Sequence, residues 1–129
     1  MTWKIHDLHD AIFGVDSRKQ AGEILKSLGG TKALLVCGPN INALGYPEEL
    51  IGILKEAGIE TVLYVKDEGE PTGDMVNKGV AIARAEKIDS IVALGGGSSM
   101  DTAKMIGKVL ANNAGRAEDL LGGYTALNV

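Results

Sequence analysis

The residues best suited to chemistry are three consecutive glycines, Gly95, Gly96 and Gly97, which follow an apolar run and precede a segment with helical spacing. Glycine has no Cβ, so its backbone reaches positive φ and lets an anionic group approach the main chain closely. The first turn of a following helix adds unpaired N–H groups and about half a positive charge. The pattern therefore predicts an anion site, and a pyrophosphate group would fit it.

Two neighbouring side chains extend this motif, and each has a structural alternative. The turn itself could reflect tight packing between a strand and a helix, without any ligand. Asp101, three residues after Ser98, could accept the backbone N–H of Ser98 in a capping box, and a carboxylate held there could also accept ribose hydroxyls. Lys104 lies one turn further along and is interpreted as a solvated surface lysine.

Other motifs that carry chemistry are missing from the sequence. It contains neither the P-loop pattern Gly-x-x-x-x-Gly-Lys-Ser/Thr nor a Gly-x-Gly-x-x-Gly after the first strong strand, which disfavours P-loop ATP hydrolysis and a standard Rossmann domain. Cys37 is the single cysteine and lies in an apolar run, so it is interpreted as a buried apolar residue. His6 and His9 are interpreted as ordinary amino-terminal histidines, because two nitrogens alone do not make a metal site.

Three short apolar runs predict the strands that must position the glycine turn. They cover residues 33–37, 61–65 and 90–94, and their starts lie 28 and 29 residues apart. That spacing is typical of one strand and one crossover helix per unit. Because the runs are almost wholly apolar, each is expected to be buried on both faces of a parallel sheet.

Helices are predicted in the gaps between these strands. Residues 17–28 carry an apolar stripe with Ile24 and Leu28, starting from a capping box at residues 17–20 and ending at Gly29. Residues 12–14 are a candidate short edge strand. The later helices are predicted to begin at Pro47, between residues 72 and 74, and at Ser98 or Ser99, with ends at Gly58, before Asp89 and near Asn112.

The predicted fold is an α/β domain with three layers, α-β-α, around a mostly parallel, Rossmann-like sheet. The 129 residues are enough for one domain, and all of residues 1–129 are assigned to it. The segment after residue 120 lacks a clear helix or strand, so the sheet is expected to be truncated before its last strand. An unpaired sheet edge of this kind favours self-association, and a homo-oligomer is expected.

Charge and hydropathy exclude several classes of partner. The net charge of −4 and the pI of about 5.1 provide no basic surface for nucleic acid or for an anionic membrane. No apolar run approaches the ~20 residues that span a bilayer, and the first residues lack the layout of a signal peptide. A cytoplasmic protein is therefore expected.

The glycine turn and its surroundings resemble one family. Residues 95–104 are similar to the Gly-Gly-Gly-Ser-x-x-Asp-x-x-Lys signature of the iron-containing (group III) alcohol dehydrogenases, within the dehydroquinate synthase-like superfamily. Ser98 favours these over the related glycerol dehydrogenases and dehydroquinate synthases, which usually lack a serine there. Residues 13–14, 32–36 and 71–72 extend the resemblance along the chain.

The resemblance implies that this chain is the NAD(P)-binding part of a dehydrogenase that transfers hydride between a nicotinamide cofactor and a small alcohol or aldehyde. Family members bind Fe²⁺ or Zn²⁺ through a helical second domain whose residues would follow Val129, so no catalytic or metal-binding residue is assigned here. The chain alone is expected to be catalytically incomplete, and a non-catalytic nucleotide-binding or regulatory module is the alternative. The implied cofactor-binding residues are Gly38, Asn40, Glu70, Gly95, Gly96, Gly97, Ser98 and Asp101.

Two of these positions depart from the family pattern. Gly38 stands where many NAD-preferring members carry an Asp. Two like charges ~4 Å apart repel by about 4 kcal/mol in a surface-like dielectric, so the missing carboxylate predicts that the 2′-phosphate of NADP is tolerated. The alternative is that Gly38 is only a turn residue. Glu70 replaces the family's Asn before Pro-Thr, which puts that adenosine contact in doubt.

Overall fold

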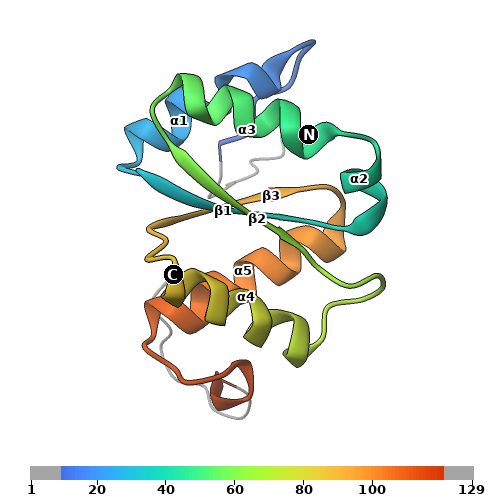
Figure 1. Cartoon of the computed structure of the whole chain (residues 1–129), viewed down its shortest axis with the longest axis vertical. Helices are drawn as coiled ribbons and strands as arrows, with labels where there is room; N and C mark the ends of the chain where they lie inside the picture. Colours follow the sequence, from blue (N-terminus) through green and yellow to red (C-terminus); the bar gives the residue numbers. More distant parts are fainter. Residues whose placement is uncertain (1–9, 121–129) are drawn as a thin grey trace, which may run out of the picture.

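The structure is a computed structural model, and it describes residues 10–120 as three layers in which one sheet lies between two layers of helices (Figure 1). The strands are β1 (Lys32–Cys37), β2 (Glu60–Val65) and β3 (Ser90–Leu94). Each predicted strand is confirmed to within one residue. The predicted α/β class with three layers is confirmed as well.

The strand order is β2-β1-β3, and β1 pairs in parallel with both neighbours. Leu34 of β1 lies between Val62 of β2 and Ile91 of β3 in the register. The chain therefore crosses over β1 on its way from β2 to β3. This crossover is the connection that the spacing of the apolar runs predicts.

The helices divide between the two faces of the sheet (Figure 1). One face carries α1 (Ala21–Ser27) and α3 (Tyr46–Glu56), and the other carries α4 (Gly73–Ala85) and α5 (Gly97–Ala111). The predicted helix starts at Pro47 and Ser98 each differ from the observed starts by one residue. The remaining helical segments are short: η1 (Ser17–Gln20), α2 (Pro39–Ala43) and η2 (Ala117–Leu120).

The core is built around β1, whose residues 33–37 are all fully buried. Leu34 and Val36 pack into a cluster with residues of α4 and α5, and Leu35 packs into a second cluster with residues of α3. Alternate side chains of the strand thus enter opposite layers. The expectation that all three strands are buried on both faces is correct only for β1, because β2 and β3 are edge strands and remain partly exposed.

Three expectations about the amino-terminal region are wrong. The capping box at residues 17–20 is not formed, because η1 is preceded by Asp16 at φ 61°, and the Asp16 carboxylate pairs with Arg18 and Lys19 instead. Residues 12–14 do not form a strand. Ile24 and Leu28 of the predicted apolar stripe are exposed, and Leu28 lies beyond the end of α1 at Ser27.

Residues 1–9 and 121–129 lie outside the described residues, and His6 and His9 fall among them. Within the described part, no helix is long and apolar enough to cross a bilayer.

The amino-terminal ends of β1 and β3 are joined through one carboxylate. Asp89 accepts hydrogen bonds from the backbone N–H groups of Thr31 and Lys32, both at 3.0 Å, from the Thr31 hydroxyl, and from Ser90 Oγ at 2.9 Å. The Thr31 hydroxyl and these backbone donors hold the pKa of Asp89 well below its ordinary value of 3.8. The ionised carboxylate is therefore the form that the fold stabilises.

We expect Asp89→Asn to lower the free energy of unfolding by about 1–2 kcal/mol at pH 7, the range for loss of a capping carboxylate. Because the folded-state pKa is lowered, the contribution is present above pH 3.8 and is lost as the pH falls below that value. Urea denaturation of both proteins between pH 7 and pH 3 measures the difference. Asp10→Asn is the control, since the Asp10 side chain makes no hydrogen bond with residues 10–120; an equal loss in both variants would contradict the prediction.

Candidate functional site

The topology opens a crevice at the carboxyl ends of β1 and β3. These strands are neighbours, yet the chain leaves β1 towards α3 on one face and leaves β3 into α5 on the other face (Figure 1). In open α/β sheets, ligands bind at such a switch point, outside the carboxyl ends of the strands. The glycine turn lies at this point.

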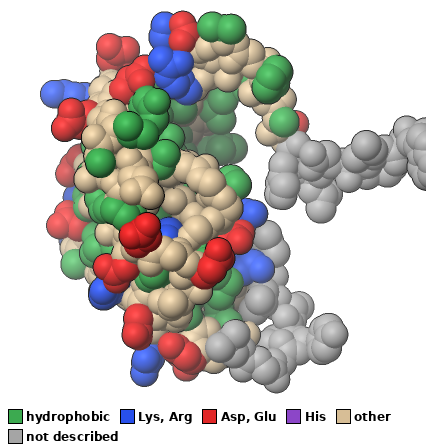
Figure 2. Space-filling view, turned by 90° about the vertical axis from the view of Figure 1, so that its right-hand side faces the viewer, with side chains coloured by type: hydrophobic (Ala, Val, Ile, Leu, Met, Phe, Trp, Pro, Cys, Tyr) green, Lys and Arg blue, Asp and Glu red, His purple; other side chains and the backbone are tan. Residues whose placement is uncertain are grey.

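A groove of about 330 Å³ occupies the crevice. Its lining residues come from the segments that follow each of the three strands. Figure 2 shows the side of the molecule on which the strands end, where a surface of backbone and uncharged polar side chains is bordered by acidic side chains. The groove is lined by Gly38, Pro39, Asn40, Ile41, Lys66, Glu68, Gly69, Glu70, Gly96, Ser98 and Ser99.

Five of the eight sequence-predicted residues meet in this groove: Gly38, Asn40, Glu70, Gly96 and Ser98. Gly38 is the N-cap of the short helix α2, which the sequence analysis did not predict.

The other three predicted residues, Gly95, Gly97 and Asp101, do not line the groove. The capping box between Asp101 and Ser98, given above as the structural alternative, is not formed, because Gly96 is the N-cap of α5 and Ser98 Oγ donates to Gly69 O at 2.7 Å. The Asp101 carboxylate is instead 63% exposed and lies 3.8 Å from Lys104 Nζ. Lys104 is exposed, as predicted.

The three glycines of the turn differ in what the protein demands of them. Gly95 has φ +135°, which side chains rarely adopt, and a Cβ there would lie 3.0 Å from Ser99 Oγ. A Cβ at Gly96 or Gly97 would meet no heavy atom within 4 Å. Packing within the described chain therefore explains Gly95 and leaves Gly96 and Gly97 unexplained.

The start of α5 presents free hydrogen-bond donors to the crevice. The first backbone bond of the helix joins Met100 N to Gly96 O at 3.1 Å. No hydrogen bond within residues 10–120 uses the backbone N–H groups of Gly97, Ser98 and Ser99. These groups, together with the helix dipole, suit a negatively charged ligand.

Sequence reasoning missed Lys66, which immediately follows β2 and lines the groove although it is only 3% exposed. Its signal in the sequence is a basic residue directly at the end of an apolar strand. Glu68 was missed as well, and its exposed side chain has no ion pair within residues 10–120.

Cys37 lies at the end of β1 and is fully buried, as predicted. Burial raises the pKa of its thiol, so the thiol stays protonated at neutral pH. Its carbonyl accepts the backbone N–H of Lys66 at 2.9 Å, which extends the β1–β2 pairing to the groove. Cys37 thus contributes packing and backbone pairing.

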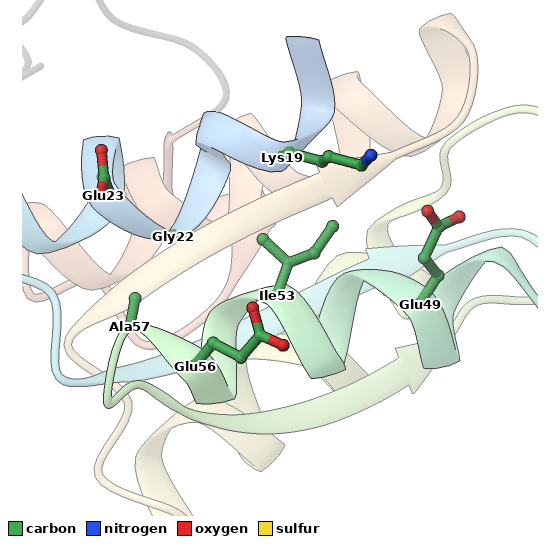
Figure 3. Close-up of a pocket in the computed structure, with 7 residues that line it drawn as sticks. All are labelled: Lys19, Gly22, Glu23, Glu49, Ile53, Glu56 and Ala57. Atoms are coloured by element: carbon green, nitrogen blue, oxygen red, sulfur yellow. The ribbon is translucent and has the colours of Figure 1, made fainter. Parts of the chain in front are cut away.

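A second surface groove, of about 480 Å³, runs between α1 and α3, and Figure 3 shows its lining side chains. Ile53 lies between the two helices, and Glu23, Glu49 and Glu56 surround it with Lys19. No residue from the carboxyl end of a strand lines this groove. Among residues 10–120, no three His, Cys, Asp or Glu side chains are grouped so as to hold a metal ion.

Sheet, switch point and glycine turn define a three-layer α/β domain whose ligand crevice lies at the carboxyl ends of its strands. Comparison with known families gives a match to the family model described as "Iron-containing alcohol dehydrogenase" over residues 9–128. The chain therefore belongs to the iron-containing alcohol dehydrogenase family, as the resemblance of its glycine turn indicated.

Relatives of known activity support this membership. The chain is 48% identical over 94 residues to a choline dehydrogenase of Bacillus subtilis, covering 73% of this chain and 23% of that protein. It is 38% identical over 112 residues to an NAD-dependent methanol dehydrogenase of Bacillus methanolicus, covering 87% and 29%. This chain thus spans about a quarter of the length of the relatives it matches.

The fold is shared with solved members of the family. An archaeal halo-thermophilic alcohol dehydrogenase from a Red Sea brine pool superposes with a TM-score of 0.79 at 39% identity, covering 92% of this chain and 31% of that one. The parallel α/β arrangement is therefore that of a family member.

The contrast between the glycines can be tested through stability. We expect Gly95→Ala to lower the free energy of unfolding by about 1–3 kcal/mol, because alanine is strained at that φ. We expect Gly97→Ala to raise it by about 0.5 kcal/mol, because alanine is the better helix residue and has free space there. Urea denaturation measures both, and destabilisation by Gly97→Ala equal to that by Gly95→Ala would contradict this account.

Proposed function

We propose that the groove at the carboxyl ends of β1 and β3 binds a nicotinamide dinucleotide, NAD or NADP, with its pyrophosphate at the glycine turn. The observation that carries this proposal is the open space beside Gly96 and Gly97. Gly97 is the first residue of α5, where glycine is a poorer helix residue than alanine. Gly96 is the N-cap, a position that glycine suits, and no atom of residues 10–120 lies within 4 Å of a Cβ at either position. Close approach of a ligand to the backbone is a reason for glycine that packing does not supply.

The chain's own groups would bind and orient the cofactor. The N–H groups of Gly97, Ser98 and Ser99 would donate to phosphate oxygens, and the dipole of the 15-residue helix α5 adds a favourable field. Asn40 and Glu70, on the other side of the groove, are proposed as contacts for the adenosine half. Asp101 is proposed to reach a ribose hydroxyl from its exposed position on α5.

We further propose that the intact enzyme oxidises or reduces a small alcohol or aldehyde by hydride transfer at the nicotinamide ring, which is the chemistry that this cofactor supplies. The part of this chain in the reaction would be cofactor binding. The Fe²⁺ or Zn²⁺ centre implied by the family is proposed to lie on residues other than 10–120. Residues 1–129 are proposed as one nucleotide-binding domain, and self-association into a homo-oligomer stays a prediction.

Replacing Gly96 tests the binding proposal directly. We expect Gly96→Val to weaken NAD binding by at least about tenfold, which corresponds to ~1.4 kcal/mol, because its side chain would stand in the space of the phosphates. The unfolding free energy should fall by no more than about 2 kcal/mol, the range for loss of a good N-cap residue, since no atom of residues 10–120 lies within 4 Å of the Cβ position. Isothermal calorimetry measures the dissociation constant. Gly52→Val is the matched control, because Gly52 also has open space but lies on α3, outside the groove. Unchanged NAD binding by Gly96→Val would contradict the proposal.

The cofactor preference is proposed to include NADP, because no carboxylate follows β1. Gly38 lines the groove, and a Cβ there would lie 3.9 Å from Ser99 Oγ, an ordinary contact that leaves room for a side chain. We expect Gly38→Asp to lower the affinity for NADP relative to NAD by at least about tenfold through charge repulsion. Titration of both cofactors into both proteins measures the ratio, with Gly38→Asn as the uncharged control. An equal shift from Asn and Asp would show that charge is not the cause.

A further inference from the structure

Lys66 is a buried charged side chain beside the groove, and the proposed function above assigns it no role. It follows β2 directly, is 3% exposed, and lines the groove together with Gly38 and Ser98. Fully buried lysines are rare in proteins unless they are paired. The partners of this ammonium group therefore decide what it does.

Its partners are neutral. Lys66 Nζ donates to Asp67 O at 3.0 Å and to Gly69 O at 2.8 Å, and no carboxylate within residues 10–120 lies within 4.0 Å of it. The carboxylate of Asp67 pairs with Lys78 Nζ at 2.8 Å, and Lys66 adds only a smaller, longer-range charge effect that also lowers the pKa of Asp67. An ammonium group has three N–H donors, so one remains after the two carbonyls.

A buried cation that forms no ion pair is costly, because a more distant opposite charge offsets its desolvation only in part. The groove beside Lys66 is the place from which an anion could provide that charge. The same carbonyl, Gly69 O, also accepts the hydroxyl of Ser98 at 2.7 Å, so Lys66 Nζ and the start of α5 are linked through a single oxygen. The ammonium thus lies next to the free N–H groups of the glycine turn.

We propose that Lys66 is the counter-charge for a phosphate group of the bound dinucleotide. This inference rests on the proposed function and adds a binding residue to it. Both the pyrophosphate and the 2′-phosphate of NADP have the required chemistry, and the experiment below distinguishes them.

The groove also carries opposing charges. Glu68 and Glu70 line it and would repel a phosphate. Both side chains are exposed, so water and salt screen them, whereas the charge of a buried lysine is screened much less. The buried ammonium therefore acts on a phosphate more strongly than an exposed carboxylate at the same distance.

The test compares Lys66→Met, which keeps an apolar stem and removes the charge, with the parent protein by calorimetric titration of NAD, NADP and adenosine. If Lys66 pairs with the pyrophosphate, we expect the variant to bind NAD at least about tenfold more weakly than the parent does. If Lys66 pairs with the 2′-phosphate, we expect only the binding of NADP to weaken by that factor. Adenosine, which has no phosphate, should bind within about twofold of its parent affinity.

The matched control is Lys78→Met, because Lys78 is also a lysine attached to the 67–70 loop but is exposed and paired with Asp67. If Lys66→Met weakened the binding of adenosine as much as that of the dinucleotides, Lys66 would only brace the loop, and the inference would be overturned. Unchanged binding of both dinucleotides would also overturn it. If the parent itself bound neither dinucleotide, the proposed function would fail, and the inference with it.

If Lys66→Met does not fold, Lys66→Gln and an NMR measurement on the parent protein replace it. The side-chain ammonium resonance of Lys66, assigned by its absence in the Gln variant, should shift on addition of inorganic pyrophosphate or NADP. A resonance that stays in place while the backbone N–H signals of Gly97 and Ser98 respond would overturn the inference.

Discussion

Strand β1 must bury both of its faces, and this requirement determines the rest of the architecture. Residues 33–37 are fully buried, with alternate side chains in two separate clusters, so helices have to cover the sheet on each side. Because β2 and β3 both pair with β1, the chain leaves neighbouring strands towards opposite layers. The crevice at the carboxyl ends of β1 and β3 is therefore a consequence of core packing, before any ligand is considered.

Within that crevice, the three glycines of the turn differ in whether the folded structure requires glycine. The backbone of Gly95 has a conformation that a side chain would strain, and Ser99 lies close to the position of its missing Cβ. Gly96 and Gly97 meet neither restriction. The same three-residue motif thus contains one position, Gly95, that requires glycine for stability, one N-cap, Gly96, that glycine suits, and one helical position, Gly97, at which alanine would be more stable. Sequence alone cannot make this distinction, because all three residues are identical in it.

The parts of the fold that could be predicted depend on local pattern. The apolar runs of the strands and the glycine turn were found from the sequence because burial and turn geometry act on neighbouring residues. Features decided by distant partners were missed. Asp89 meets Thr31 across 58 residues. The ion pairs of Asp16 with Arg18 and Lys19, and the hydrogen bonds of Lys66 to Asp67 O and Gly69 O, are local, but no apolar pattern in the sequence indicates them. Five of the eight predicted site residues line the groove because they follow strand ends, which a parallel sheet brings together.

The two ends of the sheet use backbone N–H groups in opposite ways. At the amino-terminal end, the free N–H groups of Thr31 and Lys32 are met by a carboxylate of the chain itself, and the result is a fixed connection between β1 and β3. At the carboxyl end, the free N–H groups of residues 97–99 have no such partner within residues 10–120, and the nearby buried cation Lys66 donates only to carbonyls and forms no ion pair there. Donors satisfied internally stabilise the fold, whereas unsatisfied donors beside an unpaired positive charge favour an external anion. The asymmetry between these two ends, more than the glycine motif alone, is the physical reason to place a phosphate-bearing ligand at the carboxyl end.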